Sequence, residues 1–172
     1  MGILDSFLNI TAVSRVRRNH GLEHATLNIL AQQHPHIYLA GHSDVQGFWV
    51  VGDVPTQDLA DAVGQALDRM NAGERDLAIH PNCGTNFVTA GAAAGLAAWL
   101  VMLTGGRSLR QKLDRLPLVI SMATLALIAA QPLGLILQAR VTTSGQPGNL
   151  RVTEIMARQQ GRLLTHRVVT QG

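Results

Sequence analysis

The segment His20-Gly-Leu-Glu-His24 carries the residue types of a metal site within five positions. Residues four apart share one face of a helix, so the imidazoles of His20 and His24 can bind the same metal ion. The carboxylate of Glu23 stands beside them, where it can accept a proton from a metal-bound water molecule. We therefore predict His20 and His24 as metal ligands, with Glu23 as the catalytic residue if the site is an active site.

A zinc site usually needs a third protein ligand, and the best candidates in the chain are His80 and Cys83. They stand three positions apart in the segment His80-Pro-Asn-Cys83, just before an expected helix whose first N–H groups favour a thiolate. Cys83 is the single cysteine, which excludes a disulfide framework and leaves a thiol redox role without a resolving cysteine. The remaining histidines are expected at solvent-facing or strand-end positions: His34, His36, His42 and His166. Of these, His166 is an additional candidate ligand.

The histidine pair is expected on a helix over residues 13–33, because apolar residues recur there at steps of three and four. Both histidines share the apolar stripe with Leu27 and Leu30, so they should face the interior. Buried polar groups need partners, which leaves two interpretations open. The cluster either binds a metal ion or forms a hydrogen-bonded group that braces the helix.

The elements around this helix predict a small domain of order α-β-β-α-β. Two short β-prone runs, Ile37–Ala40 and Phe48–Val51, flank a Gly-rich loop typical of a hairpin. A second amphipathic helix is expected after the cap Pro55-Thr56, closed by Asn71 and Gly73, and Leu77–His80 is expected to be a third strand.

Two long stretches without any charged residue follow, thirty residues from Leu77 to Gly106 and twenty-four from Leu116 to Ala139. They contain the apolar runs Phe87–Leu103 and Leu118–Leu137, and about twenty apolar residues are enough to cross a bilayer. We therefore predict two transmembrane helices, the second one kinked at Pro132.

Composition and charge favour the same interpretation. The 172 residues are 47% apolar and only 15% charged, with a net charge of +3. The basic residues are scattered singly beside apolar runs, an arrangement that is typical of membrane anchoring rather than nucleic-acid binding. The expected partner is the lipid bilayer, and Gly91 and Gly95 offer a small-residue face on which another helix can pack.

The sequence thus predicts an α+β protein in three parts. Residues 1–85 form the small α/β domain with the His/Glu/Cys cluster, and residues 86–139 form a two-helix transmembrane hairpin with a basic loop. Residues 140–172 form a short basic C-terminal tail, in which Leu150–Met156 and Leu163–Val169 are expected as strand or helix.

We expect a multi-pass protein of the plasma or inner membrane. Met1–Ile10 is too short for a secretory signal and carries Asp5, so the N-terminal domain is expected in the cytoplasm. The four basic residues from Arg107 to Arg115 oppose this orientation, and the five from Arg140 onward support it.

The H-x-x-E-H pattern of His20–His24 resembles the signature of the inverzincin metallopeptidases. This resemblance implies a zinc-dependent hydrolase whose third ligand is a downstream glutamate. The chain departs from the pattern here, because Glu74 and Glu154 are the remaining glutamates and neither has a recognisable context.

A second resemblance covers residues 20 to 143. The motifs His20-Gly-Leu-Glu-His24, Cys83-Gly-Thr-Asn-Phe87 and Gln138-Ala-Arg-Val-Thr-Thr143 are similar to H-G-A-E-H, C-G-T-S-F and Q-x-x-T-T of the YqhQ-type membrane proteins. The present chain has Leu22 in place of Ala and Asn86 in place of Ser. The resemblance implies a bacterial-type integral membrane protein of undefined role.

Two functions therefore compete. The first is a membrane protein with a zinc site, with metal-assisted hydrolysis at the membrane face as the reaction class. The second is a scaffold or assembly subunit without enzymatic activity, in which the histidine cluster is structural.

Overall fold

The computed structural model describes residues 2–104, 106, 108–161 and 163–172, and it divides into two compact units. The first unit contains residues 1–80 and 139–172, and the second contains residues 81–138. Arg107, which was counted in the predicted basic loop, lies outside the described residues.

The first unit begins with a short helix α1 (Ile3–Leu8) and the long helix α2 (Thr11–Gln33), which confirms the predicted helix over residues 13–33. Helix α3 (Thr56–Asn71) confirms the second predicted helix, and Pro55 precedes it as the N-cap. Both helices form because apolar residues recur at helical spacing and a proline limits one end: Pro35 follows α2 and Pro55 starts α3.

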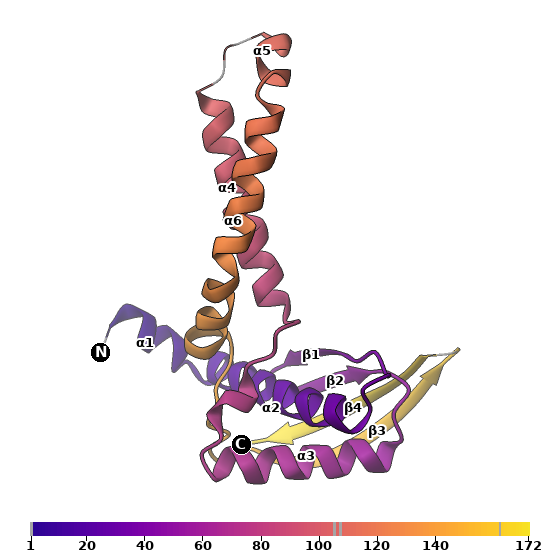
Figure 1. The fold of residues 1–172 in the computed structure, drawn as a ribbon. Helices are drawn as coiled ribbons and strands as arrows, with labels where there is room; N and C mark the ends of the chain where they lie inside the picture. Colours follow the sequence, from indigo (N-terminus) through magenta and orange to yellow (C-terminus); the bar gives the residue numbers. More distant parts are fainter. Residues whose placement is uncertain (1, 105, 107, 162) are drawn as a thin grey trace. The chain divides into compact units, whose positions relative to one another are not determined.

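The sheet of this unit has four antiparallel strands, β1 (Ala40–Asp44), β2 (Gly47–Val51), β3 (Arg151–Gln160) and β4 (Leu163–Gln171). Their spatial order is β1-β2-β4-β3 (Figure 1). The sheet therefore joins a hairpin from the N-terminal part of the chain to a hairpin from its C-terminal end.

The predicted first strand over 37–40 is wrong in position, because the strand begins where that range ends. Asp44 pairs directly with Gly47, so the expected Gly-rich loop is replaced by a tight two-residue turn. Gly47 has a φ of +147°, and a Cβ there would lie 2.0 Å from the carbonyl oxygen of Val168. Only glycine allows the close approach of β4 at this turn.

The C-terminal segment is not a tail attached to a finished domain, which corrects the predicted fold. Both C-terminal stretches, for which the sequence predicts strand or helix, are strands, and β4 pairs with β2 along Gly47–Val51. Strand pairing between segments so distant in the sequence has no local signal.

The predicted third strand over residues 77–80 is also wrong. The segment forms a short 3-10 helix, η1 (Arg75–Ala78), before it extends. The side-chain amide of Asn28 donates hydrogen bonds to the carbonyls of Leu77 and Ile79, both at 3.0 Å. Helix α2 therefore provides these carbonyls with the hydrogen-bond donors that a neighbouring strand would otherwise provide.

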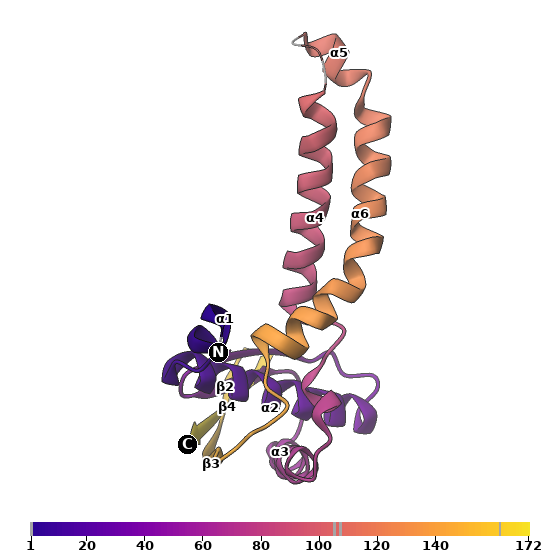
Figure 2. The same cartoon turned by 90° about the vertical axis from the view of Figure 1, so that its left-hand side faces the viewer.

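Helices α2 and α3 cover one face of the sheet (Figure 2). The side chains between the layers are apolar and almost completely buried. The largest are Leu22, Leu30, Phe48, Val50, Leu59, Val63 and Val168. This core holds α2, and with it the predicted site residues, against the sheet.

The second unit consists of α4 (Gly84–Leu103), the short α5 (Leu109–Leu113) and α6 (Leu116–Leu137). Along the chain, α6 continues into a π-helical turn, η2 (Gln138–Thr142), of which only Gln138 belongs to this unit. Helices α4 and α6 lie side by side (Figure 1), and both are long and apolar enough to cross a membrane. Helix α6 bends in its C-terminal third, the part that contains Pro132 (Figure 2).

The two apolar helices meet through a polar pair at one end of the hairpin. The amide of Gln138 donates a hydrogen bond to Oδ1 of Asn86 at 2.6 Å. A Cβ on Gly134 would lie 2.9 Å from Cα of Asn86, so glycine permits this close approach. Gly91 and Gly95 do not take part in this packing, because a Cβ on either residue would meet nothing within 4 Å.

Candidate metal centre

Helix α2 brings the rings of His20 and His24 into contact, with ring centroids 4.3 Å apart. His24 is buried and His20 is half-buried, because both lie on the face of α2 that packs into the first unit. The ring of His80, which follows η1, lies 5.6 Å from that of His24. Three of the predicted site residues therefore form one cluster of imidazoles.

The orientation of the two α2 histidines is set by backbone carbonyls. Nδ1 of His24 lies 2.8 Å from the carbonyl oxygen of Ala78, and Nδ1 of His20 lies 3.0 Å from that of Thr142. A carbonyl only accepts, so each Nδ1 carries a proton, and the neutral form of each ring has its lone pair at Nε2. Metal-binding histidines show the same pattern, since their second nitrogen usually donates to a carbonyl or carboxylate.

Glu23 lies beside the cluster and reaches from α2 to strand β1. The hydroxyl of Ser43 donates a hydrogen bond to Oε2 of Glu23. A Cβ on Gly41 would lie 2.1 Å from Oε1 of Glu23, so the carboxylate occupies the space that this glycine leaves open. No local sequence signal indicates Gly41 or Ser43 as site residues, because pairing of the strand decides which of its residues face α2.

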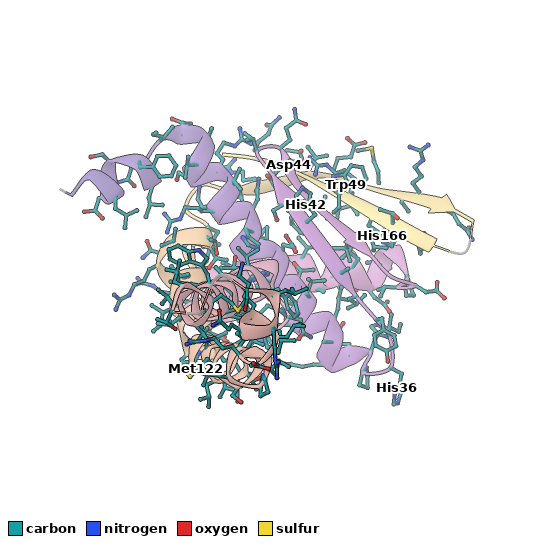
Figure 3. All side chains as sticks on the ribbon, turned by 90° about the horizontal axis from the view of Figure 1, so that it is seen from above. His36, His42, Asp44, Trp49, Met122 and His166 are labelled. Carbon is teal, nitrogen blue, oxygen red and sulfur yellow. The ribbon has the colours of Figure 1, made fainter. Side chains whose placement is uncertain are left out.

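Burial raises the pKa of Glu23 above its usual range, although the Ser43 hydrogen bond and the charges of His20 and His42 lower it. His42 lies on β1 and pairs with Trp49 of β2, which places both on the sheet face turned away from the core (Figure 3). A carboxyl group with a raised pKa takes up a proton closer to neutral pH, which suits a general base.

The pKa of His80 is lowered, first by burial and then by the charge of His24. A lowered pKa keeps the imidazole neutral near pH 7, and the neutral ring is the form that binds metals.

Cys83 lies in the second unit, three residues along the chain from His80. Its sulfur accepts from the backbone N–H of Thr85 at 3.5 Å, so Cys83 is the N-cap of α4. A zinc site can take two imidazole nitrogens and one sulfur, the ligand atoms that His20, His24 and Cys83 each offer.

The other histidines differ in burial, although the sequence predicts solvent-facing or strand-end positions for all of them. His34 lies 3.0 Å from a carboxylate oxygen of Asp58, and His36 is exposed (Figure 3). His166 was expected at a solvent-facing or strand-end position, but it is completely buried on β4. Its Nε2 lies 3.1 Å from the hydroxyl of Thr56, the first residue of α3.

Comparison with known proteins places these residues in a family. A family model described as a domain of unknown function, DUF6391, matches residues 15–155. An uncharacterized protein of Picosynechococcus sp. is 38% identical over 157 residues, which covers 81% of this chain and 71% of the relative. No solved structure matches the chain.

Proposed function

The chain belongs to the DUF6391 family, and from its own geometry we propose that it is an integral membrane protein with a zinc centre on its α/β unit. His20 and His24 are the first two ligands, and Cys83 or His80 supplies the third. The likeness to the YqhQ-type proteins, which share the three motifs around apolar segments, supports the membrane part of this proposal.

The observation that carries the zinc centre is the pair of oriented histidines on α2. Their ring centroids lie 4.3 Å apart, and each Nδ1 is held by a backbone carbonyl. A bracing cluster does not require both rings to carry their proton at Nδ1, the arrangement that is common in metal-binding histidines. Imidazole together with thiolate favours zinc over magnesium or calcium, which prefer oxygen ligands.

Chain connectivity makes Cys83 an effective third ligand. Three residues span at most about 11 Å, so Cys83 cannot lie far from His80, whose ring is 5.6 Å from that of His24. His80 is the alternative ligand for the same reason.

We propose metal-assisted hydrolysis at the membrane face as the reaction class, in line with the inverzincin likeness of His20–His24. A zinc ion at this site would supply an acidified water molecule and a Lewis acid. The contribution of the chain itself is Glu23, a buried carboxylate with a raised pKa that can hold or accept a proton beside the two histidines. Ser43 fixes its orientation, and Gly41 gives it room.

A scaffold function is the second candidate, because one observation favours it. The small-residue face of α4 at Gly91 and Gly95 is turned away from α6 and has nothing within 4 Å of either Cβ position. Such a face permits close packing of another transmembrane helix.

For either function we propose a multi-pass protein of the plasma or inner membrane, with the α/β unit on the cytoplasmic side. The two apolar helices support this location by their length and composition.

Metal analysis of the full chain purified from membranes tests the zinc centre. We expect about one zinc ion per chain in the wild type and less than about a tenth of this in the His20→Ala/His24→Ala variant. His36→Ala removes an exposed histidine and serves as the matched control. Equal zinc content in the wild type and the double variant contradicts the proposal.

Cobalt substitution then shows whether Cys83 or His80 is the third ligand. With Cys83 as a ligand, the cobalt protein has a sulfur-to-cobalt charge-transfer band that Cys83→Ser removes. With His80 as the ligand, the band is absent and His80→Ala lowers the zinc content instead. Glu23→Gln is expected to retain zinc but to lose hydrolytic activity if the centre is catalytic; retained activity excludes Glu23 as the general base.

A further inference from the structure

A cavity of about 340 Å³ opens on the first unit next to the carbonyls that hold the histidines. Its wall comes from η1 and the residues after it, from α2, and from the segment that follows α6. This volume is within the range of small-ligand sites. The lining residues that carry charge are Arg17, Arg75 and Asp76.

Arg17 is held rigidly at this cavity. Its Nε donates to the carbonyl of Val141 at 2.7 Å, and its Nη2 donates to those of Arg140 and Thr143, both at 3.1 Å. The two N–H groups on Nη1 have no acceptor among the residues that the structure describes. The guanidinium is therefore fixed in place with donors still available, which is a suitable arrangement for binding an oxyanion.

Arg75 supplies the second positive charge. Its side chain is exposed and makes no hydrogen bond or ion pair with any described residue. Gly145 packs directly against it, because a Cβ there would lie 2.7 Å from Cβ of Arg75. The absence of a side chain at Gly145 brings the segment after α6 close to Arg75, and Ser144 of that segment adds a hydroxyl to the wall.

The charge of this cavity favours an anion. Arg17 and Arg75 outweigh Asp76, which leaves a net charge of +1 among the lining residues. A second cavity of about 520 Å³ has Glu74 and Asp76 in its wall and no basic residue. The Arg17 and Arg75 cavity is therefore the one with the donors and the charge for an anionic group.

One lining residue of the cavity lies close in the sequence to the end of α6, and this indicates which anion the cavity binds. Ala139 lies in its wall and follows the last residue of α6, Leu137, by two positions. The end of a membrane-spanning helix lies at the depth of the lipid headgroups, where phosphate is the common anion.

We propose that this cavity binds a phosphate group, which Arg17 and Arg75 hold with charge-assisted hydrogen bonds. The ligand is the headgroup of an anionic phospholipid or a soluble phosphate compound. Binding of phosphate does not depend on the zinc centre, whereas the lipid source depends on the membrane location in the proposed function.

Phosphate binding is tested with the full chain in a nonionic detergent. Inorganic phosphate and a short-chain phosphatidic acid are titrated separately, and thermal stabilisation gives the apparent Kd for each. Arg75→Gln is the main variant, because that side chain contacts no described residue by hydrogen bond and its loss should not affect folding. Arg158→Gln removes an exposed arginine of β3 in the same unit and is the matched control. Asp76→Asn removes the negative charge in the wall of the cavity and tests whether a more positive cavity binds phosphate more tightly.

We expect Arg75→Gln to weaken phosphate binding about tenfold, as loss of a charge-assisted hydrogen bond does. Arg158→Gln should leave the Kd unchanged, and Asp76→Asn should strengthen binding severalfold. Binding of the lipid alone identifies a headgroup site, and binding of both ligands identifies a general phosphate site.

Equal effects of Arg75→Gln and Arg158→Gln overturn the proposal, as does the absence of saturable binding of either ligand. A loss of binding confined to the His20→Ala/His24→Ala variant also overturns it, because the phosphate would then be bound by the metal. Zinc content is measured on the same samples. Normal zinc in Arg75→Gln with weakened phosphate binding shows that the two sites are independent, so each proposal can fail alone.

Discussion

The two units use the same apolar residue types in opposite ways. In the first unit, Leu22, Leu30 and Leu59 are 0% exposed, because α2 and α3 pack on the sheet. In the second unit, Leu125 is 58% exposed and Ile128 is 59% exposed, and no residue of α4 is buried. The chain therefore supplies apolar surroundings for the first set of side chains but not for the second set.

The two units also differ in where their polar side chains form hydrogen bonds. The first unit has buried polar pairs such as Thr170, whose hydroxyl donates to Oδ1 of Asn19 at 2.7 Å. In the second unit, the hydrogen bond from Gln138 to Asn86 joins the two long helices at one end. A soluble fold needs its own core, while a helical hairpin in lipid needs satisfied backbone groups and a few contacts that set its packing.

The strongest test of this contrast is the same truncation in each unit. Leu22→Ala should lower the free energy of unfolding by about 4 kcal/mol, because it leaves a cavity in a closed core. Leu125→Ala should lower it by less than about 0.5 kcal/mol, because lipid or detergent fills the space. Urea unfolding in detergent measures both: the fluorescence of Trp49 in a Trp99→Phe background reports on the first unit, and that of Trp99 in a Trp49→Phe background reports on the second. Similar losses in the two variants would show that α6 is buried in protein.

A charge placed in the middle of α6 separates lipid from other surroundings. Ile128→Lys should disfavour membrane insertion by about 3 kcal/mol, the cost of a lysine at the centre of a spanning helix. Tyr38→Lys changes a residue of the first unit that is 97% exposed and should have no effect. The fraction of protein retained in alkali-washed membranes measures the difference. Full retention of Ile128→Lys would contradict a spanning role for α6.

The polar contact of the hairpin should have a smaller effect. Gln138→Ala removes the hydrogen bond to Asn86 and should destabilise the hairpin by about 1 kcal/mol, as is usual for such bonds between membrane helices. Gln131→Ala removes an exposed amide of the same helix and is the matched control. Loss of helicity on titration with a denaturing detergent measures both variants. An equal response would mean that the pair does not hold the helix ends together.

The smallest expected effect is a pH dependence within the first unit. Burial lowers the pKa of His166, so the folded state binds its proton less readily than the unfolded state does. This destabilisation is absent above the unfolded pKa of about 6.5 and grows as the pH falls from there through the lower folded pKa. His166→Gln should therefore flatten the decline in unfolding free energy below pH 6.5. The exposed His36→Gln should keep the wild-type slope, and an unchanged slope in His166→Gln would assign the decline to other groups.

Periodic patterns made the helices predictable. Helices α2 and α3 and the two apolar helices have bounds close to the predicted ones, because apolar spacing, prolines and long uncharged runs are local signals. The pairing of β4 with β2 was not predictable, since it joins residues more than a hundred positions apart. For the same reason the sequence could not show that Gly41 and Ser43 lie at Glu23.

The sequence by itself determined the residue types of the candidate site, the helical spacing that puts His20 and His24 on one face, and the two apolar stretches. These properties follow from local periodicity and composition. Only the tertiary structure decided which carbonyls orient the histidines, that Leu77–His80 is held by Asn28 rather than by a strand, and that the C-terminal segment completes the sheet. Those features depend on contacts between distant segments, and such contacts are set by packing of the whole unit rather than by any single stretch of the chain.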